Sequence, residues 1–67
     1  MRIDAKKIRN MLFDKGIKQK ELASMAGISN STMSAITNGR SCSSESGRKI
    51  AAALGVSIEE IERKVYV

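Results

Sequence analysis

Glycine recurs in this chain just after segments whose apolar residues lie three or four residues apart, the period of an amphipathic helix. Four of the five glycines follow this rule; they are Gly16, Gly27, Gly39 and Gly55. A residue just past the end of a helix often needs the left-handed backbone conformation, and glycine adopts it without steric cost. No segment alternates apolar and polar residues for long enough to predict a β-strand. The chain is therefore predicted to form successive short helices.

Residues that favour helix starts divide the chain into five predicted helices. The expected capping residues are Asp4, Glu21 as a capping-box acid, Ser29, one serine among Ser41, Ser43 and Ser44, and the pair Ser57 and Glu60. The residues expected to face inward are Ala5, Ile8, Met11, Leu12, Leu22, Ala23, Ala26, Met33, Ile36, Ile50, Ala51, Ala53, Leu54, Ile58 and Ile61. Gly47 should weaken the fourth helix by about 0.5–1 kcal/mol relative to alanine. The prediction is an all-α, compact five-helix domain over residues 1–67, without a linker.

The composition excludes several kinds of site. The chain has no histidine, no proline and a single cysteine, Cys42. It therefore has no His/Cys metal site, no His-activated nucleophile and no internal disulfide, so packing alone must hold the fold. Cys42 is expected to be a small, partly buried residue that fills space in the fold. A single cysteine without a disulfide partner suits a reducing cytosol. No apolar run approaches membrane-spanning length, so we expect a cytoplasmic protein without membrane association.

The charge of the chain is positive and unevenly distributed. Twelve Lys and Arg against seven Asp and Glu give a formal net charge of +5, a balance that favours a polyanionic partner. No acid lies in residues 22–44, whereas Glu59, Glu60 and Glu62 gather near the end of the chain. One surface of the molecule should therefore lack negative charge.

Residues 19–39 contain the residue types that a helix-turn-helix needs. Ala23 is small enough to let two helices cross closely, Gly27 permits a tight turn, and Ile28, Met33 and Ile36 can lock the second helix onto the first. Between these apolar positions the chain carries short, uncharged hydrogen-bonding residues, which are mediocre helix formers. A merely solvated helix face would usually carry Glu, Lys, Gln or Ala instead.

The chain resembles the lambda-repressor-like helix-turn-helix domains, also called the XRE or Cro type, over roughly residues 4–62. The matching residues are Gln19, Leu22, Ala23, Ala26, Gly27, Ile28, Met33, Ser34, Ile36, Asn38 and Gly39. Residues 49–57, KIAAALGVS, also look like the family's fourth helix and following turn. Because the match extends beyond the helix-turn-helix, it is more specific than that motif alone.

The resemblance implies which residues would contact double-stranded DNA. Asn30 and Ser31 would face base edges in the major groove, with Thr32, Ser34 and Ala35 alongside, since amide, hydroxyl and methyl groups can each read bases. The residues implied to contact phosphates are Gln19, Lys18, Lys20, Ser29, Asn38 and Arg40. For the lysines, a solvated surface is the alternative.

Two positions depart from the family pattern. Relatives often have Thr or Ser, which can cap the second helix, where this chain has Lys18. Many relatives also pair an Arg late in the first helix with a Glu just before the Asn-Gly, where this chain has Leu12 and Thr37. The ion pair is therefore absent, Leu12 is expected in the core, and the bracing of Asn38 and Gly39 is in question.

The function expected from these features is sequence-specific binding of double-stranded DNA by a small transcriptional regulator, a repressor of phage or mobile-element type. The alternative is a protein-interaction module, such as an antitoxin or anti-repressor, that kept the fold. An enzyme is disfavoured because Glu59 and Glu60 face different sides of a helix, and no cofactor or small-molecule ligand is expected.

The short recognition segment suggests a homodimer, at least on DNA, because one copy would read few bases. The candidate dimer contacts are Phe13, Ile61, Val65, Tyr66 and Val67, with core packing the alternative for Phe13 and Ile61. Residues 64–67 could instead pair with residues 1–3, pair with the same segment of a second subunit, or fray.

Overall fold

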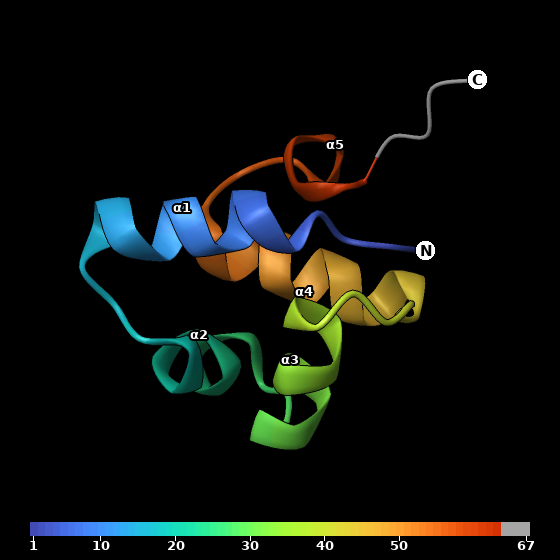
Figure 1. Ribbon diagram of the computed structural model, residues 1–67, viewed down its shortest axis with the longest axis horizontal. Coiled ribbons are helices and arrows are strands. Elements are labelled where there is room, and N and C mark those ends of the chain that lie inside the picture. Colours follow the sequence, from blue (N-terminus) through green and yellow to red (C-terminus); the bar gives the residue numbers. More distant parts are fainter. Residues whose placement is uncertain (64–67) are drawn as a thin grey trace.

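Five helices form along residues 1–63, the part of the chain that the computed structural model describes (Figure 1). The helices are α1 (Ala5–Lys15), α2 (Gln19–Ala26), α3 (Asn30–Thr37), α4 (Ser44–Leu54) and α5 (Ile58–Ile61). This order confirms the predicted all-α, five-helix architecture. The pairing and dimer contacts considered for residues 64–67 lie outside the described residues.

Four of the five helices begin at residues that the sequence predicted as caps. The exception is α2, where Lys18 is the N-cap without a side-chain hydrogen bond and the capping box expected from Glu21 does not form. The Asp4 carboxylate accepts backbone N–H groups at the start of α1, and the Ser29 hydroxyl accepts one at the start of α3. Of the three serines considered for α4, Ser43 is the cap. Ser57 and Glu60 form the capping box of α5, in which the Ser57 N–H donates to Glu60 Oε2 at 3.1 Å. These contacts satisfy backbone donors that lack an intrahelical partner.

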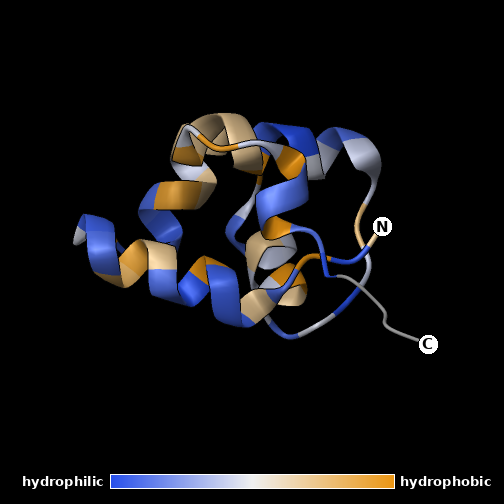
Figure 2. Ribbon diagram, turned by 90° about the horizontal axis from the view of Figure 1, so that it is seen from above, coloured by the Kyte–Doolittle hydropathy of each residue, from blue (hydrophilic) through white to orange (hydrophobic). Residues whose placement is uncertain are grey.

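The helices bury one shared apolar core. α2 packs against both α3 and α4, α1 packs against α3, and α4 packs against α5. Figure 2 shows hydrophobic residues recurring between hydrophilic ones along the helices, as an amphipathic pattern requires. The buried apolar residues are Ile3, Ile8, Leu12, Leu22, Ala23, Ala26, Met33, Ile36, Ile50, Ala51, Leu54 and Ile61. Leu12 is thus in the core, as expected, while Met11, Ala53 and Ile58 are partly buried against it.

The start of the chain is held against the end of α5. Ile3 and Glu62 form an isolated antiparallel bridge, the Asp4 N–H donates to the Ile61 carbonyl at 2.8 Å, and the Arg63 N–H donates to the Arg2 carbonyl at 2.9 Å. Ile61 is 0% exposed, so its prediction as a dimer contact is wrong and the core alternative is right.

Phe13, the other candidate dimer contact within residues 1–63, is exposed and not buried. Its side chain is 87% exposed, so the core alternative is wrong for this residue. Phe13 is next to buried Leu12 in α1 but points away from the core. One residue of helix turns a side chain by about 100°, which is enough to carry it from the buried face to solvent.

Residues near the start of α4 hold Met1. The Met1 ammonium donates to the Cys42 carbonyl at 2.8 Å, and the Cys42 N–H donates to the Met1 carbonyl at 2.7 Å. A Cβ on Gly47 would lie 2.6 Å from Met1 Sδ and 3.3 Å from Ile58 Cδ1, so a larger residue at this position in α4 would require these side-chain ends to shift. Cys42 is half-buried, as expected for a filler, and burial raises the pKa of its thiol.

No helix within residues 1–63 is long and apolar enough to cross a membrane.

Candidate nucleic-acid interface

A three-residue connection joins α2 to α3. Gly27 has φ 72°, in the left-handed region, so the chain can leave α2 in a tight turn. The Ile28 N–H then donates back to the Ala23 carbonyl at 3.0 Å, and Ser29 caps the next helix. Ala23 is buried where α2 packs against its neighbours. The expected helix-turn-helix is therefore formed by α2 and α3.

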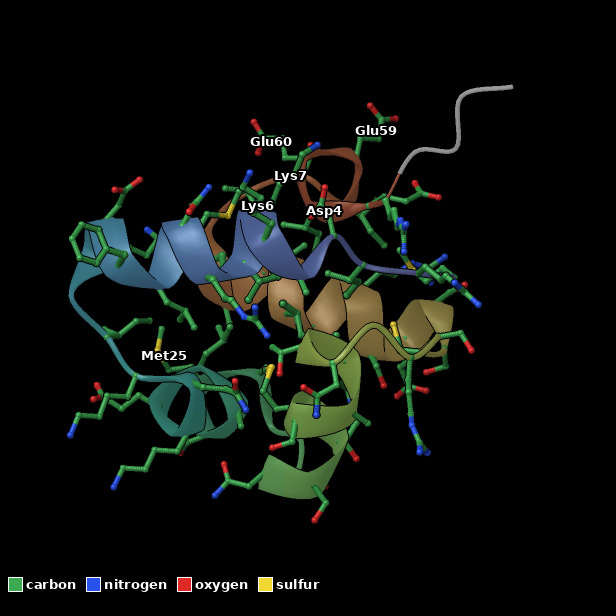
Figure 3. All side chains as sticks on the ribbon, in the orientation of Figure 1. Asp4, Lys6, Lys7, Met25, Glu59 and Glu60 are labelled. Carbon is green, nitrogen blue, oxygen red and sulfur yellow. The ribbon has the colours of Figure 1, made fainter. Side chains whose placement is uncertain are left out.

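α3 presents an exposed side that faces away from α1 and α5. In Figures 1 and 3, α3 lies on the opposite side of the molecule from the start of α1 and from α5. Its inner side is anchored by Met33 and Ile36, which are both buried. The two residues are three positions apart, so they share one face and leave the other face to solvent.

The proposed base-contacting residues occupy this outer side of α3. Asn30, Ser31, Thr32 and Ser34 are exposed, and Ala35 is half-buried. The Thr32 Oγ1 accepts a hydrogen bond from the Ser29 hydroxyl at 2.8 Å, so this hydroxyl is oriented by the helix cap. Asn30 and Ser31 stand in the first turn of α3. The structure therefore places all five residues on one helix, with the four polar ones at its surface.

Gln19 connects the two helices of the motif. Its Nε2 donates to Ser34 Oγ at 3.2 Å, and its Oε1 accepts the Thr37 hydroxyl at 3.1 Å. Both bonds join the first residue of α2 to the second half of α3. Gln19 was predicted from the sequence as a phosphate contact, and the structure gives it an additional role in holding α3 in register with α2.

The other proposed phosphate-contacting residues lie at three places, the start of α2 and the two ends of α3. Lys18 and Lys20 are exposed at the start of α2, where the helix dipole favours an anion. Ser29, Asn38 and Arg40 are exposed at the two ends of α3. The Arg40 N–H donates to the Ala35 carbonyl at 3.0 Å, which ties the residue to the helix that precedes it.

Acidic residues are absent from α3 but not from the whole motif, since Glu21 is exposed in the first turn of α2. No acid lies in residues 22–44, which include α3 and most of α2. Asp4, Glu59 and Glu60 lie on the side where α1 begins and α5 packs, opposite α3 (Figure 3). Glu45 lies in α4 beside Lys49, with Nζ and Oε1 3.4 Å apart, but both groups are solvent-exposed, so the ion pair adds little stability. The outer side of α3 therefore suits a polyanion.

Sequence reasoning missed one contact at the end of α3. Arg9 of α1 donates from Nη2 to the Thr37 backbone carbonyl at 3.1 Å. The Thr37 side chain, only 4% exposed, donates its hydroxyl to Gln19. The only signal in the sequence was that Arg9 stands beside Ile8 and one turn before Leu12, at the edge of the apolar stripe. The bracing that the absent ion pair put in question is thus supplied by other residues.

A comparison with protein-family models matches residues 7–63 to the Cro/C1-type HTH DNA-binding domain. The match covers α2 and α3 together with the helices that pack against them. The chain belongs to the Cro/C1-type helix-turn-helix family of DNA-binding domains. A search of curated proteins found no match. The family resemblance noted from residues 19–39 is confirmed by this result.

Replacing Lys18 by threonine should stabilise this Cro/C1-type domain. Lys18 has the extended backbone of an N-cap residue, but no side-chain bond caps α2. A hydroxyl at this position can accept a free backbone N–H of the first turn, which stabilises a helix by about 1 kcal/mol. In thermal unfolding we therefore expect the midpoint to rise by about 4–8 °C.

The control for this change is Lys20→Thr, which removes the same charge inside α2, away from the cap. Its midpoint should not rise, because threonine is a poorer helix former than lysine. A midpoint for Lys18→Thr that is unchanged or lower would contradict the assignment of Lys18 as the N-cap of α2.

Proposed function

We propose that this protein is a sequence-specific double-stranded DNA-binding regulator, a repressor of the small phage or mobile-element type, that binds its site as a homodimer. The observation that supports it most strongly is the outer side of α3. Asn30, Ser31 and Ser34 are exposed there, and Gln19 holds Ser34 from the neighbouring helix. Short amide and hydroxyl side chains let a helix approach base edges closely, and they pair with those edges.

The proposed division of labour follows from the chemistry of the side chains. Asn30, Ser31, Thr32, Ser34 and Ala35 would contact bases. Gln19, Lys18, Lys20, Ser29, Asn38 and Arg40 would contact phosphates, which sets affinity and register. Three of these six are cations, so a dimer would bring six cations to the DNA backbone. The logarithm of the association constant should then fall with the logarithm of salt concentration with a slope of about −5.

The dimer is supported by the size of the recognition surface. One exposed face of an eight-residue helix can read only a few base pairs, so two copies on a two-fold site would reach useful affinity. Among the candidate contacts within residues 1–63, Phe13 is exposed and Ile61 is buried. The proposal therefore retains Phe13 as a dimer contact and drops Ile61.

The test is selection of bound sequences from a pool of random DNA duplexes, followed by sequencing and titration of the selected duplex at two salt concentrations. We expect a two-fold motif whose half-sites lie about 10–10.5 base pairs apart, bound far more tightly than random DNA. Salt-sensitive binding without enrichment of any sequence motif would indicate a DNA-binding protein that does not choose a sequence. Negligible binding even at low salt would favour the protein-interaction alternative, such as an antitoxin or anti-repressor.

A further inference from the structure

Arg9, an exposed residue of α1, hydrogen-bonds the end of α3. Its Nη2 lies 3.1 Å from the backbone carbonyl oxygen of Thr37, 28 residues later in the chain. Thr37 is in the last turn of α3, where carbonyl groups lack intrahelical donors and where a cation is favoured by the helix dipole. Because the acceptor is a backbone atom, the bond fixes the main chain itself and not one side chain.

The turn that follows Thr37 is tied closely to α3. The Gly39 N–H donates to the Ile36 carbonyl and the Arg40 N–H donates to the Ala35 carbonyl, each at 3.0 Å. Gly39 has φ 93°, a conformation that sends the chain sharply away from the helix axis. Any shift of the last turn of α3 would therefore move Asn38 and Arg40 with it.

Thr37 is also held from a second side. Its hydroxyl lies 3.1 Å from Gln19 Oε1 and 3.1 Å from the Ser34 carbonyl of its own helix, so its single proton is shared between the two acceptors. α1 and α2 therefore both contact the same residue of α3. The Thr37 side chain is buried at this junction. The last turn of α3 is therefore positioned relative to two helices at once, which leaves it little freedom to rotate.

We propose that Arg9 is a positioning residue for DNA binding, which sets the place of the Asn38–Arg40 turn against the phosphate backbone by bonding the Thr37 carbonyl. This inference rests on the proposed function. The ion pair that the family resemblance implies at positions 12 and 37 cannot form between Leu12 and Thr37. The guanidinium of Arg9, three residues before Leu12, contributes a charged donor at the same junction.

The test compares Arg9→Ala with Lys7→Ala on the selected duplex at fixed salt. Both changes remove one positive charge from α1, but Lys7 is exposed on the side where α5 packs (Figure 3). We expect Arg9→Ala to weaken binding about tenfold, because a shifted Asn38–Arg40 turn would weaken more than one phosphate contact at once. Lys7→Ala should weaken it by no more than about twofold, through long-range charge alone. Arg9→Lys, which keeps a charged donor, should recover part of the loss.

A double-mutant cycle separates positioning from direct contact. If Arg9 acts through the turn, Arg9→Ala combined with Arg40→Ala should weaken binding by clearly less than the product of the two single effects. The reason is that Arg40 contributes less to the affinity once the turn is misplaced, so its removal then costs less. An effect equal to that product would mean that Arg9 contacts a phosphate itself, and would overturn the inference.

Two further outcomes would also overturn the inference about Arg9. The first leaves the proposed function intact, and the second does not. If both single variants are folded at the assay temperature, as thermal unfolding shows, and Arg9→Ala binds as Lys7→Ala does, Arg9 has only a structural role. In that case the proposed function stands. If the wild-type protein binds no duplex more tightly than random DNA, the proposed function and this inference fail together.

Discussion

Replacing Leu22 by alanine is expected to lower the free energy of unfolding by about 2–5 kcal/mol. Leu22 is 0% exposed in α2, the helix that packs against both α3 and α4. A domain of this size has about 3–10 kcal/mol of stability in total, and it has no disulfide to add to the core. The loss would therefore be a large share of the whole. Chemical denaturation with urea measures it directly.

Met25 offers a matched control in the same helix. It lies three residues after Leu22 and is 57% exposed (Figure 3). Met25→Ala also shortens an apolar side chain in α2, but it leaves no buried cavity, so the free energy of unfolding should change by less than about 0.5 kcal/mol. Equal effects of the two changes would contradict the placement of α2 against the core. If Leu22→Ala is unfolded at the assay temperature, its loss of DNA binding would report the unfolding and would not show that Leu22 takes part in binding.

Replacing Asn30 by alanine is expected to relax the choice of sequence while leaving the fold intact. Asn30 is the first residue of α3 and is exposed, and Ser29, not Asn30, supplies the cap. Removal of the amide should therefore cost little stability, since alanine is the better helix former. If Asn30 pairs with a base, its loss should remove about 1–3 kcal/mol of discrimination at one position of the site. Ser31→Ala should have a smaller effect of the same kind.

The measurement is a second selection from random duplexes with each variant, in which the base preferences are compared position by position. Arg40→Ala is the matched comparison. It should weaken binding to all sequences to a similar degree and make the salt slope shallower. Gln19→Ala is less suitable, because Gln19 also bonds Ser34 and Thr37. Unchanged base preferences for both Asn30→Ala and Ser31→Ala would contradict the assignment of the outer side of α3 to base contacts.

The helix boundaries could be read from local chemistry. Asp4, Ser29 and Ser57 start helices because each sits beside backbone N–H groups that no residue of the helix can satisfy. Gly27 ends a helix because its backbone is left-handed there. These interactions span only a few residues, so the order of residue types along the chain specifies them. The apolar period likewise placed Leu22, Met33 and Ile36 in the core.

Side chains at the edge of an apolar stripe could not be assigned in this way. Phe13 and Ile61 were both considered as dimer contacts with core packing as the alternative, and the structure exposes the first and buries the second. Their fates depend on where α1 and α5 meet other elements. Gly47 is a further example, since Met1, which occupies the space beside it, is 46 residues away in the chain.

The sequence by itself therefore determined the five helices, the helix-turn-helix of α2 and α3, and the acid-free stretch from residue 22 to 44. Only the tertiary structure decided how the end of α3 is held. The bonds from Arg9 to the Thr37 carbonyl and from Gln19 to Ser34 join residues 28 and 15 positions apart. Such bonds exist only when the helices cross at the right distance and angle, and helical periodicity fixes the face of each helix but not how two faces meet.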